Sequence, residues 1–238
     1  MKILPVIDVR GGLAVRAVAG ERASYRPFQS TLSPEADPLT LARRGRERWG
    51  FVSIYLADLD AIEQGGPASP RANVALWDNL VADGFDLLLD PGIEHAGDVE
   101  GGLTPADSRL VVASESAESL AELRRCLRFD VVIGCDLRGG RSLGPPGALD
   151  LVRESERSTL VLDLKAVGVG GGVPTLPLCR ELIEAKPSRP VLTGGGVRSI
   201  ADVRAAADAG VSELLIASAL YDGRLSDDDL RPFLAPAG

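Results

Sequence analysis

Two copies of a short motif, each with one Asp, constrain this sequence more than any other feature. Residues 6–12 read VIDVRGG and residues 134–140 read GCDLRGG. An apolar run followed by glycines predicts a buried strand that ends at a turn. Asp8 and Asp136 are therefore expected at equivalent strand ends in two halves of the protein, facing one cleft. Two carboxylates placed in this way suit acid–base catalysis.

The repeat extends well beyond this motif. Residues 55–62, 86–93 and 109–114 match residues 160–167, 190–197 and 213–218, at offsets of 104 or 105 residues. Asp8 and Asp136 are 128 residues apart, so the first half holds roughly two dozen extra residues near positions 20–38. We interpret this excess as a long loop that forms a lid or a binding segment. The alternative is a solvated insertion.

Eight short apolar runs predict eight strands that are buried on both faces, as in a parallel sheet. The expected strands are residues 3–7, 51–57, 86–89, 109–113, 130–135, 159–164, 190–193 and 213–217. Helical patterns lie between them, at residues 38–48, 70–83, 116–127, 147–155, 175–185 and 199–209. The expected fold is α/β, a single (β/α)8 TIM barrel over residues 1–238 with a half-barrel internal repeat. An open doubly wound sheet is the competing architecture, but its dinucleotide fingerprint is absent after the first strand.

Composition limits the partners that this chain is expected to bind. Hydrophobic residues make up 45% of the chain, and the net charge is −8. The negative charge argues against nucleic acids and acidic membranes, although it allows a small phosphorylated metabolite held by local donors. Three widely spaced cysteines show no disulfide or metal pattern, which favours the cytoplasm. We expect no cofactor and no metal, and a monomer or small homo-oligomer.

Glycines after the seventh and eighth expected strands predict a phosphate site. The seventh strand ends in Gly194, Gly195 and Gly196, and the eighth in Ala217 and Ser218. Main-chain N–H groups at these positions can approach a phosphate, and barrels of this kind usually bind one there. The equivalent site in the first half is altered, because Asp90 adds negative charge and Pro91 has no N–H to donate. The residues expected to contact substrate or phosphate are Gly194, Gly195, Gly196, Ala217, Ser218, Gly170, Gly171, Gly92, Ser114 and Arg16.

Lys165 stands where the first half has Asp60, at the mouth of the sixth strand. It is one of only three lysines in the chain. It can pair with Asp163 or Asp58, contact an anion, or form a Schiff base if it is desolvated. We include Lys165 and Asp163 among the candidate catalytic residues with Asp8 and Asp136. A weaker alternative is that the carboxylates of Asp58, Asp60 and Asp163 bind a divalent cation.

Several segments together resemble a known family. LPVIDVRGGLAVR, YLADLDAI, GCDLRGGR, LTGGGVRSIADV and IASALYDG are similar to the histidine-biosynthesis barrels, namely the ribotide isomerase and the cyclase subunit of imidazole glycerol phosphate synthase. This resemblance implies a TIM barrel, no cofactor, and an Amadori rearrangement in which Asp8 and Asp136 carry acid–base catalysis. The cyclase has a Lys near its first strand, whereas Val9 and Arg10 follow Asp8 here.

The chain departs from that family at three places. Pro91 interrupts the first glycine loop, Ala166 to Gly170 replace an acidic-basic-Asp-Gly-Thr loop, and Asp163 stands where the isomerase has Thr. The chain is similar to a divergent isomerase-related group in organisms that make methanopterin-type cofactors. We expect an isomerase acting on a phosphorylated aminosugar, outside histidine biosynthesis in this interpretation. The alternatives are a lyase or condensing enzyme that uses Lys165 as a Schiff base, and a non-catalytic subunit that binds a phosphometabolite.

Overall fold

Eight parallel strands close into a barrel in the computed structural model, which describes residues 1–234. The strands, in chain order, are β1 (Lys2–Arg10), β4 (Ser53–Asp58), β5 (Asp86–Asp90), β6 (Arg109–Ala113), β7 (Val131–Arg138), β9 (Thr159–Asp163), β10 (Val191–Gly194) and β11 (Glu213–Ile216). Each strand pairs with the next, and β1 closes the ring by pairing with both β4 and β11. The predicted barrel is confirmed, and the open sheet is excluded because neither β1 nor β11 is an edge.

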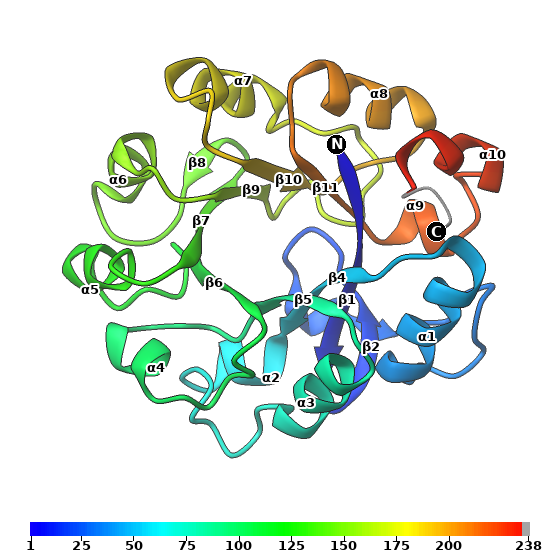
Figure 1. Ribbon diagram of the computed structural model, residues 1–238, viewed down its shortest axis with the longest axis horizontal. Helices are drawn as coiled ribbons and strands as arrows, with labels where there is room; N and C mark the ends of the chain where they lie inside the picture. Colours follow the sequence, from blue (N-terminus) through cyan, green and yellow to red (C-terminus); the bar gives the residue numbers. More distant parts are fainter. Residues whose placement is uncertain (235–238) are drawn as a thin grey trace.

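Helices surround the barrel as an outer layer (Figure 1). They are α1 (Pro38–Trp49), α2 (Leu59–Glu63), α3 (Val74–Ala82), α4 (Ala96–Glu100), α5 (Leu120–Cys126), α6 (Ala148–Glu154), α7 (Leu176–Ala185), α8 (Ile200–Asp208), α9 (Ser218–Tyr221) and α10 (Asp227–Leu230). Local signals set several ends. Asp37 caps α1 by accepting a hydrogen bond from the Thr40 N–H at 2.7 Å, and Gly50 ends that helix in a left-handed conformation. The helix expected over 116–127 begins only at Leu120, because Ser119 is its capping residue.

Alternate residues of the strands divide the buried side chains into two clusters. One cluster fills the barrel interior and includes Leu4, Tyr55, Leu88, Leu160 and Leu192. The larger cluster lies between the barrel and the helices, with Trp77 and Leu123 fully buried in it. The interior cluster fills the barrel below Asp8 and Asp136, so these two carboxylates stand on a packed floor rather than in an open channel.

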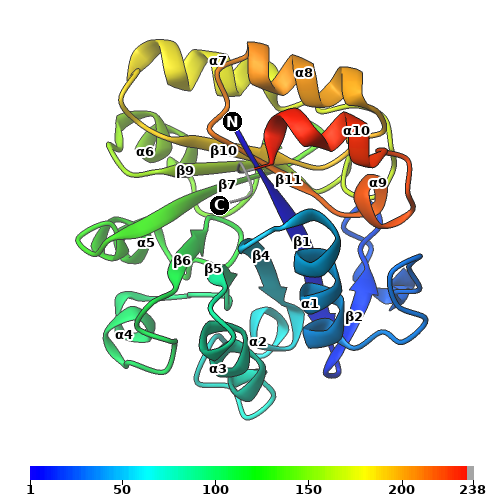
Figure 2. The ribbon, with the colours of Figure 1, turned by 45° about the vertical axis from the view of Figure 1, so that its right-hand side comes forward.

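The two Asp motifs form equivalent hairpins at one end of the barrel. β1 turns back into β2 (Leu13–Arg16), and β7 turns back into β8 (Arg141–Ser142). The Gly-Gly pairs 11–12 and 139–140 all have positive φ, between 59° and 78°, as a two-residue hairpin turn requires. β2 also pairs with the short β3 (Arg26–Pro27), and Figure 2 shows this hairpin extending beyond the barrel on the side of α9.

The described chain forms one barrel, whereas the expected domain boundary at residue 238 lies outside the described residues. Within residues 1–234, no helix has both the length and the apolar character needed to cross a bilayer. Cys126, Cys135 and Cys179 are buried and free.

Candidate active site

A cavity of about 120 Å³ opens at the carboxyl ends of the barrel strands. Eight of the residues selected from sequence line it: Asp8, Asp136, Gly195, Gly196, Ala217, Ser218, Gly170 and Arg16. The other six lie outside its lining: Lys165, Asp163, Gly194, Gly171, Gly92 and Ser114. The cavity therefore brings together the two Asp residues and the glycine loops that follow β10 and β11.

Asp8 and Asp136 face each other across this cavity. They lie on β1 and β7, which are four strands apart in the ring of eight, so the two carboxylates come from opposite walls. Both line the same cavity. A ligand between them meets one carboxyl group on each side.

Asp136 is held in place by the loop that follows β6. The Ser114 hydroxyl donates to an Asp136 carboxylate oxygen at 3.2 Å and accepts from the Asp136 N–H at 3.0 Å. The Glu115 N–H donates to the same carboxylate oxygen at 3.1 Å. Burial and the nearby Glu115 charge raise the pKa of Asp136 to about 6, against the lowering effect of these hydrogen bonds.

Asp8 has no such support. Within residues 1–234 its carboxylate accepts no hydrogen bond, and burial raises its pKa to about 7. The two carboxyl groups therefore exchange protons close to neutral pH, where a group serves well as either acid or base.

The hairpin turns are held by other carboxylates, not by Asp8 and Asp136. Asp60 accepts from the Gly11 N–H at 2.6 Å, and Asp163 accepts from the N–H groups of Gly139 and Gly140 at 2.9 and 2.8 Å. Asp163 is one of the candidate catalytic residues predicted from the sequence. Its carboxylate is buried against this turn and also accepts from the Lys165 N–H at 3.0 Å. Turn capping is thus the contact that the structure gives to Asp163, which leaves Asp8 and Asp136 free to face the cavity.

One end of the cavity offers hydrogen-bond donors. The main-chain N–H groups of Gly195, Gly196 and Ser218 have no main-chain acceptor within residues 1–234. Gly196 has φ +84°, and an added Cβ would lie 1.9 Å from the Gly172 oxygen, so only glycine fits this loop.

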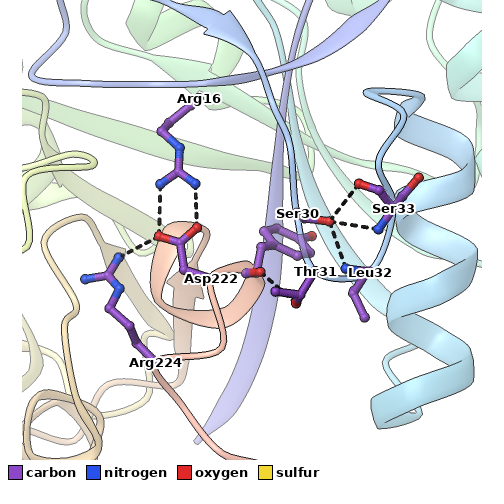
Figure 3. Close-up of polar contacts among 8 residues, drawn as sticks. Arg16, Ser30, Thr31, Leu32, Ser33, Asp222 and Arg224 are labelled. Carbon is purple, nitrogen blue, oxygen red and sulfur yellow. Dashed lines mark hydrogen bonds and ion pairs between the residues drawn. The ribbon is translucent and has the colours of Figure 1, made fainter.

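Two guanidinium groups add positive charge at the same end (Figure 3). Arg16 donates to Asp222 at 3.0 Å, and Arg224 donates to Asp222 at 3.5 Å. Asp222 thereby holds both cations at the cavity wall, since Arg16 and Arg224 both line it. Two cations against one carboxylate leave this end with a net positive charge, which suits a phosphate.

The opposite end of the cavity is acidic. Asp90 is the last residue of β5 and Glu115 follows β6, and these two strands lie four strands around the ring from β10 and β11. Burial and the Asp136 charge raise the pKa of Asp90 to about 7. Tyr55 donates to Asp90 at 3.2 Å, and burial raises the pKa of Tyr55 well above its ordinary value, so the phenol stays protonated.

Gly92 and Ser114 belong to this acidic end but do not line the cavity. The Gly92 N–H donates to Asp90 at 3.2 Å, and Ser114 is bonded to Asp136 as described above. Their donors are engaged within the protein, so we do not place either residue in the proposed ligand site.

The long first loop forms one wall of the cavity. Gly20, Arg22, Tyr25 and Phe28 from this loop all line it. Arg22 forms an ion pair with Glu115 at 2.8 Å, across the cavity mouth. The base of the loop is fixed at α9, because Thr31 donates to the Tyr221 carbonyl at 3.1 Å (Figure 3). The Phe28 ring also packs edge-on against the Tyr221 ring, with the ring centroids 5.3 Å apart. The long first loop thus contributes to the cavity wall, and its interpretation as a lid stays a prediction.

Lys165 lies away from this cavity. Its side chain is exposed and lines a separate surface hollow with Arg138, Arg141 and Glu21. Within residues 1–234 it forms no ion pair with Asp163 or Asp58. No group of three His, Cys, Asp or Glu side chains in the described part of the chain has the arrangement of a metal site.

Several cavity residues were not selected from the sequence. Tyr55, Glu115, Arg22 and Arg224 line the site but were not among the selected residues. Only Tyr55 carried a usable signal, because it begins the repeated segment 55–62 and brings a polar hydroxyl into a strand that is otherwise apolar from Ile54 to Ala57.

Residues 2–226 of the chain match the family model described as "Histidine biosynthesis protein". The chain belongs to this family. The resemblance expected from sequence is thereby confirmed.

Similar proteins within the family cover nearly the whole chain. An uncharacterized protein of Methanocaldococcus jannaschii is 29% identical over 234 residues, which is 97% of each chain. The 1-(5-phosphoribosyl)-5-((5-phosphoribosylamino)methylideneamino) imidazole-4-carboxamide isomerase of Jannaschia sp. is 30% identical over 240 residues, covering 94% of this chain and 96% of the relative. The isomerase of the same name from Rubrobacter xylanophilus is 29% identical, covering 99% and 96%. The two relatives named as isomerases support an enzyme of the isomerase type.

Proposed function

We propose that this protein is an aldose–ketose isomerase that acts on a phosphorylated aminosugar. The single observation that carries the proposal is the pair Asp8 and Asp136 on opposite walls of one cavity, beside a cradle of free N–H groups and arginines. The family of the chain and the isomerase names of its relatives support the same reaction type.

The carboxyl pair provides the proton transfers that such a rearrangement requires. One protonated carboxyl group donates to the ring oxygen of the aminoaldose as the ring opens. One ionised carboxylate removes the proton from C2, and the C–H bond electrons form the enolamine. In the ring opening the C1–O bond breaks and the nitrogen lone pair forms a C1=N bond, which accepts the electrons when C2 loses its proton. Protonation at C1 and loss of the C2 hydroxyl proton then give the aminoketose, so the reaction is redox-neutral overall, with two protons added and two removed.

The surroundings of the two Asp residues favour a state in which one carboxyl group is protonated and the other is ionised. With pKa values of about 7 and about 6, Asp8 and Asp136 together hold about one proton between these values. Gly195, Gly196, Arg16 and Arg224 hold the phosphate, which fixes the sugar between the carboxyl groups.

Direct turnover measurements test the proposal. Purified protein is incubated with the aminoaldose ribotide named for the relatives and with singly phosphorylated aminoaldoses, and the ketose product is followed by chromatography. We expect at least one substrate to be converted, and Asp8→Asn and Asp136→Asn each to reduce kcat by about a hundredfold or more. Asp107→Asn is the matched control, because Asp107 is exposed and outside the cavity. Turnover that persists in both cavity variants would contradict the proposal.

A further inference from the structure

One end of the cavity is positively charged and the other is negatively charged. A substrate with a phosphate at each end is complementary to only one of them. Gly195, Gly196, Arg16 and Arg224 form the donor end. Asp90, Glu115 and Asp136 line the other end, where the main-chain donors nearest to a ligand are used by the protein itself. A phosphate at this second end would face three carboxylates, and the cation that lines this end, Arg22, is already paired with Glu115.

Two of the three carboxylates at the acidic end have no cation of their own. Within residues 1–234 neither Asp90 nor Asp136 forms an ion pair, whereas Glu115 is paired with Arg22 at 2.8 Å. Asp90 is only 7% exposed, yet it lines the cavity. A buried carboxylate without a cationic partner carries a desolvation cost that a ligand cation can offset.

The protein supplies a second sign that this end is built for a donor group. Asp90 is fixed at the cavity wall, because Tyr55 donates to one of its carboxylate oxygens at 3.2 Å and the Gly92 N–H donates to the other at 3.2 Å. Both donors are neutral, so they orient the carboxylate without balancing its charge.

We propose that the substrate carries a single phosphate, bound at the Gly195–Gly196 end, and a protonated amine at its other end, bound by Asp90 with Glu115. This inference rests on the proposed isomerase function and narrows its substrate class. It separates the chain from its isomerase relatives, whose printed name contains two phosphoribosyl groups.

Equilibrium binding measures this preference without turnover. Isothermal titration calorimetry is run at about pH 8, where an alkyl amine is protonated and these carboxylates are ionised. It compares three classes of probe, and the comparison is repeated with matched alkyl chains from propyl to hexyl. The probes are ω-aminoalkyl monophosphates, alkyl monophosphates and alkanediol bisphosphates. We expect the best aminoalkyl phosphate to bind at least about tenfold more tightly than its alkyl counterpart. We expect the bisphosphate to bind more weakly than either.

Variants assign the preference to the acidic end. Asp90→Asn and, separately, Glu115→Gln are expected to reduce the preference for the amine while leaving alkyl phosphate affinity within about twofold. That unchanged affinity also shows that each variant is folded. Glu118→Gln is the control, because Glu118 is exposed, three residues from Glu115 and outside the cavity lining. It is expected to keep the full preference.

The outcomes separate this inference from the proposed function. Tightest binding by the bisphosphate, or an amine preference that survives in Asp90→Asn and Glu115→Gln, would overturn the inference. Turnover of a bisphosphorylated aminoaldose that is lost in Asp8→Asn would uphold the isomerase and overturn the inference alone. An amine preference that disappears in Asp90→Asn but persists in Asp8→Asn supports the inference whether or not a substrate is converted.

Discussion

Ser114 holds Asp136 by two hydrogen bonds, one donated to its carboxylate at 3.2 Å and one accepted from its N–H at 3.0 Å. Ser114 does not line the cavity, so we infer that it is a positioning residue for Asp136. Ser114→Ala removes a donor that stabilises the ionised carboxylate, which raises the pKa of Asp136 further. We expect kcat to fall roughly tenfold and the acidic limb of the pH–rate profile to move to higher pH. Ser116→Ala is the control, and a fall in kcat with an unmoved limb would contradict this role.

The pH dependence of turnover reports on the two carboxyl groups together. The reaction needs one protonated and one ionised group, so kcat/KM is expected to rise through about pH 6 and to fall above about pH 7. The measurement is kcat/KM over a broad pH range, corrected for the second ionisation of the substrate phosphate, which lies near about pH 6. A flat profile between pH 5 and 9 would argue against the Asp pair.

Asp90 also makes stability depend on pH. Its pKa in the folded protein, about 7, lies above the ordinary value of 3.8, so the stabilising contribution of the protonated form is present below about pH 4 and is lost as pH rises through about 7. The rise corresponds to at most about 4 kcal/mol. We expect Asp90→Asn to increase the free energy of unfolding above about pH 7, with little change near pH 4. Denaturant unfolding at both pH values, with Asp107→Asn as control, measures this difference, and an equal effect at both would be inconsistent with a buried ionised Asp90.

Gly196→Ala should damage both the fold and the anion end. The added Cβ would lie 1.9 Å from the Gly172 oxygen, and φ is +84°. We expect a loss of more than about 2 kcal/mol in unfolding free energy, together with a loss of alkyl phosphate binding. Gly223→Ala is the matched control, since Gly223 has φ +72° but no atom within 4 Å of the added Cβ. It should cost only the backbone strain, about 1 kcal/mol. Equal losses in the two variants would mean that the contact with Gly172 is unimportant.

Lys165→Met separates the isomerase from the Schiff-base alternative. Because the Lys165 side chain is exposed and outside the cavity, we expect kcat and KM to stay within about twofold of the wild type. The second measurement is mass spectrometry after borohydride reduction with a carbonyl substrate, in which no adduct at Lys165 is expected. An adduct at Lys165 together with loss of turnover in Lys165→Met would favour the lyase instead.

The strands and the barrel could be predicted from the sequence, because a strand that is buried on both faces consists of consecutive apolar residues. Such runs end at Asp8 and Asp136, and the duplicated Gly-Gly pairs fix the turns. The short elements were missed for a physical reason. β2, β8 and the four- or five-residue helices are too short to show a period, and their residues are placed by the turns and strands that precede them.

Site residues could be predicted from sequence only where the residue type has a single common role at that position. Carboxylates at strand ends have several uses, and the sequence alone could not separate Asp163, which holds a turn, from Asp136, which faces the cavity. The deciding factor is which main-chain N–H groups lie nearby. Glu115 and Arg22 are 93 residues apart in the chain, so their contact depends on how the first loop crosses the barrel mouth.

The contact between Arg16 and Asp222 joins residues 206 positions apart. Asp8 and Asp136 are both present once the fifth barrel strand has been synthesised, but the donor end also needs Ser218 on α9 and Asp222, which lie more than 80 residues further along the chain. The growing chain therefore acquires its two carboxyl groups well before it acquires the complete phosphate end. A chain shortened before Ser218 would retain both carboxyl groups and still lack the means to hold a substrate between them.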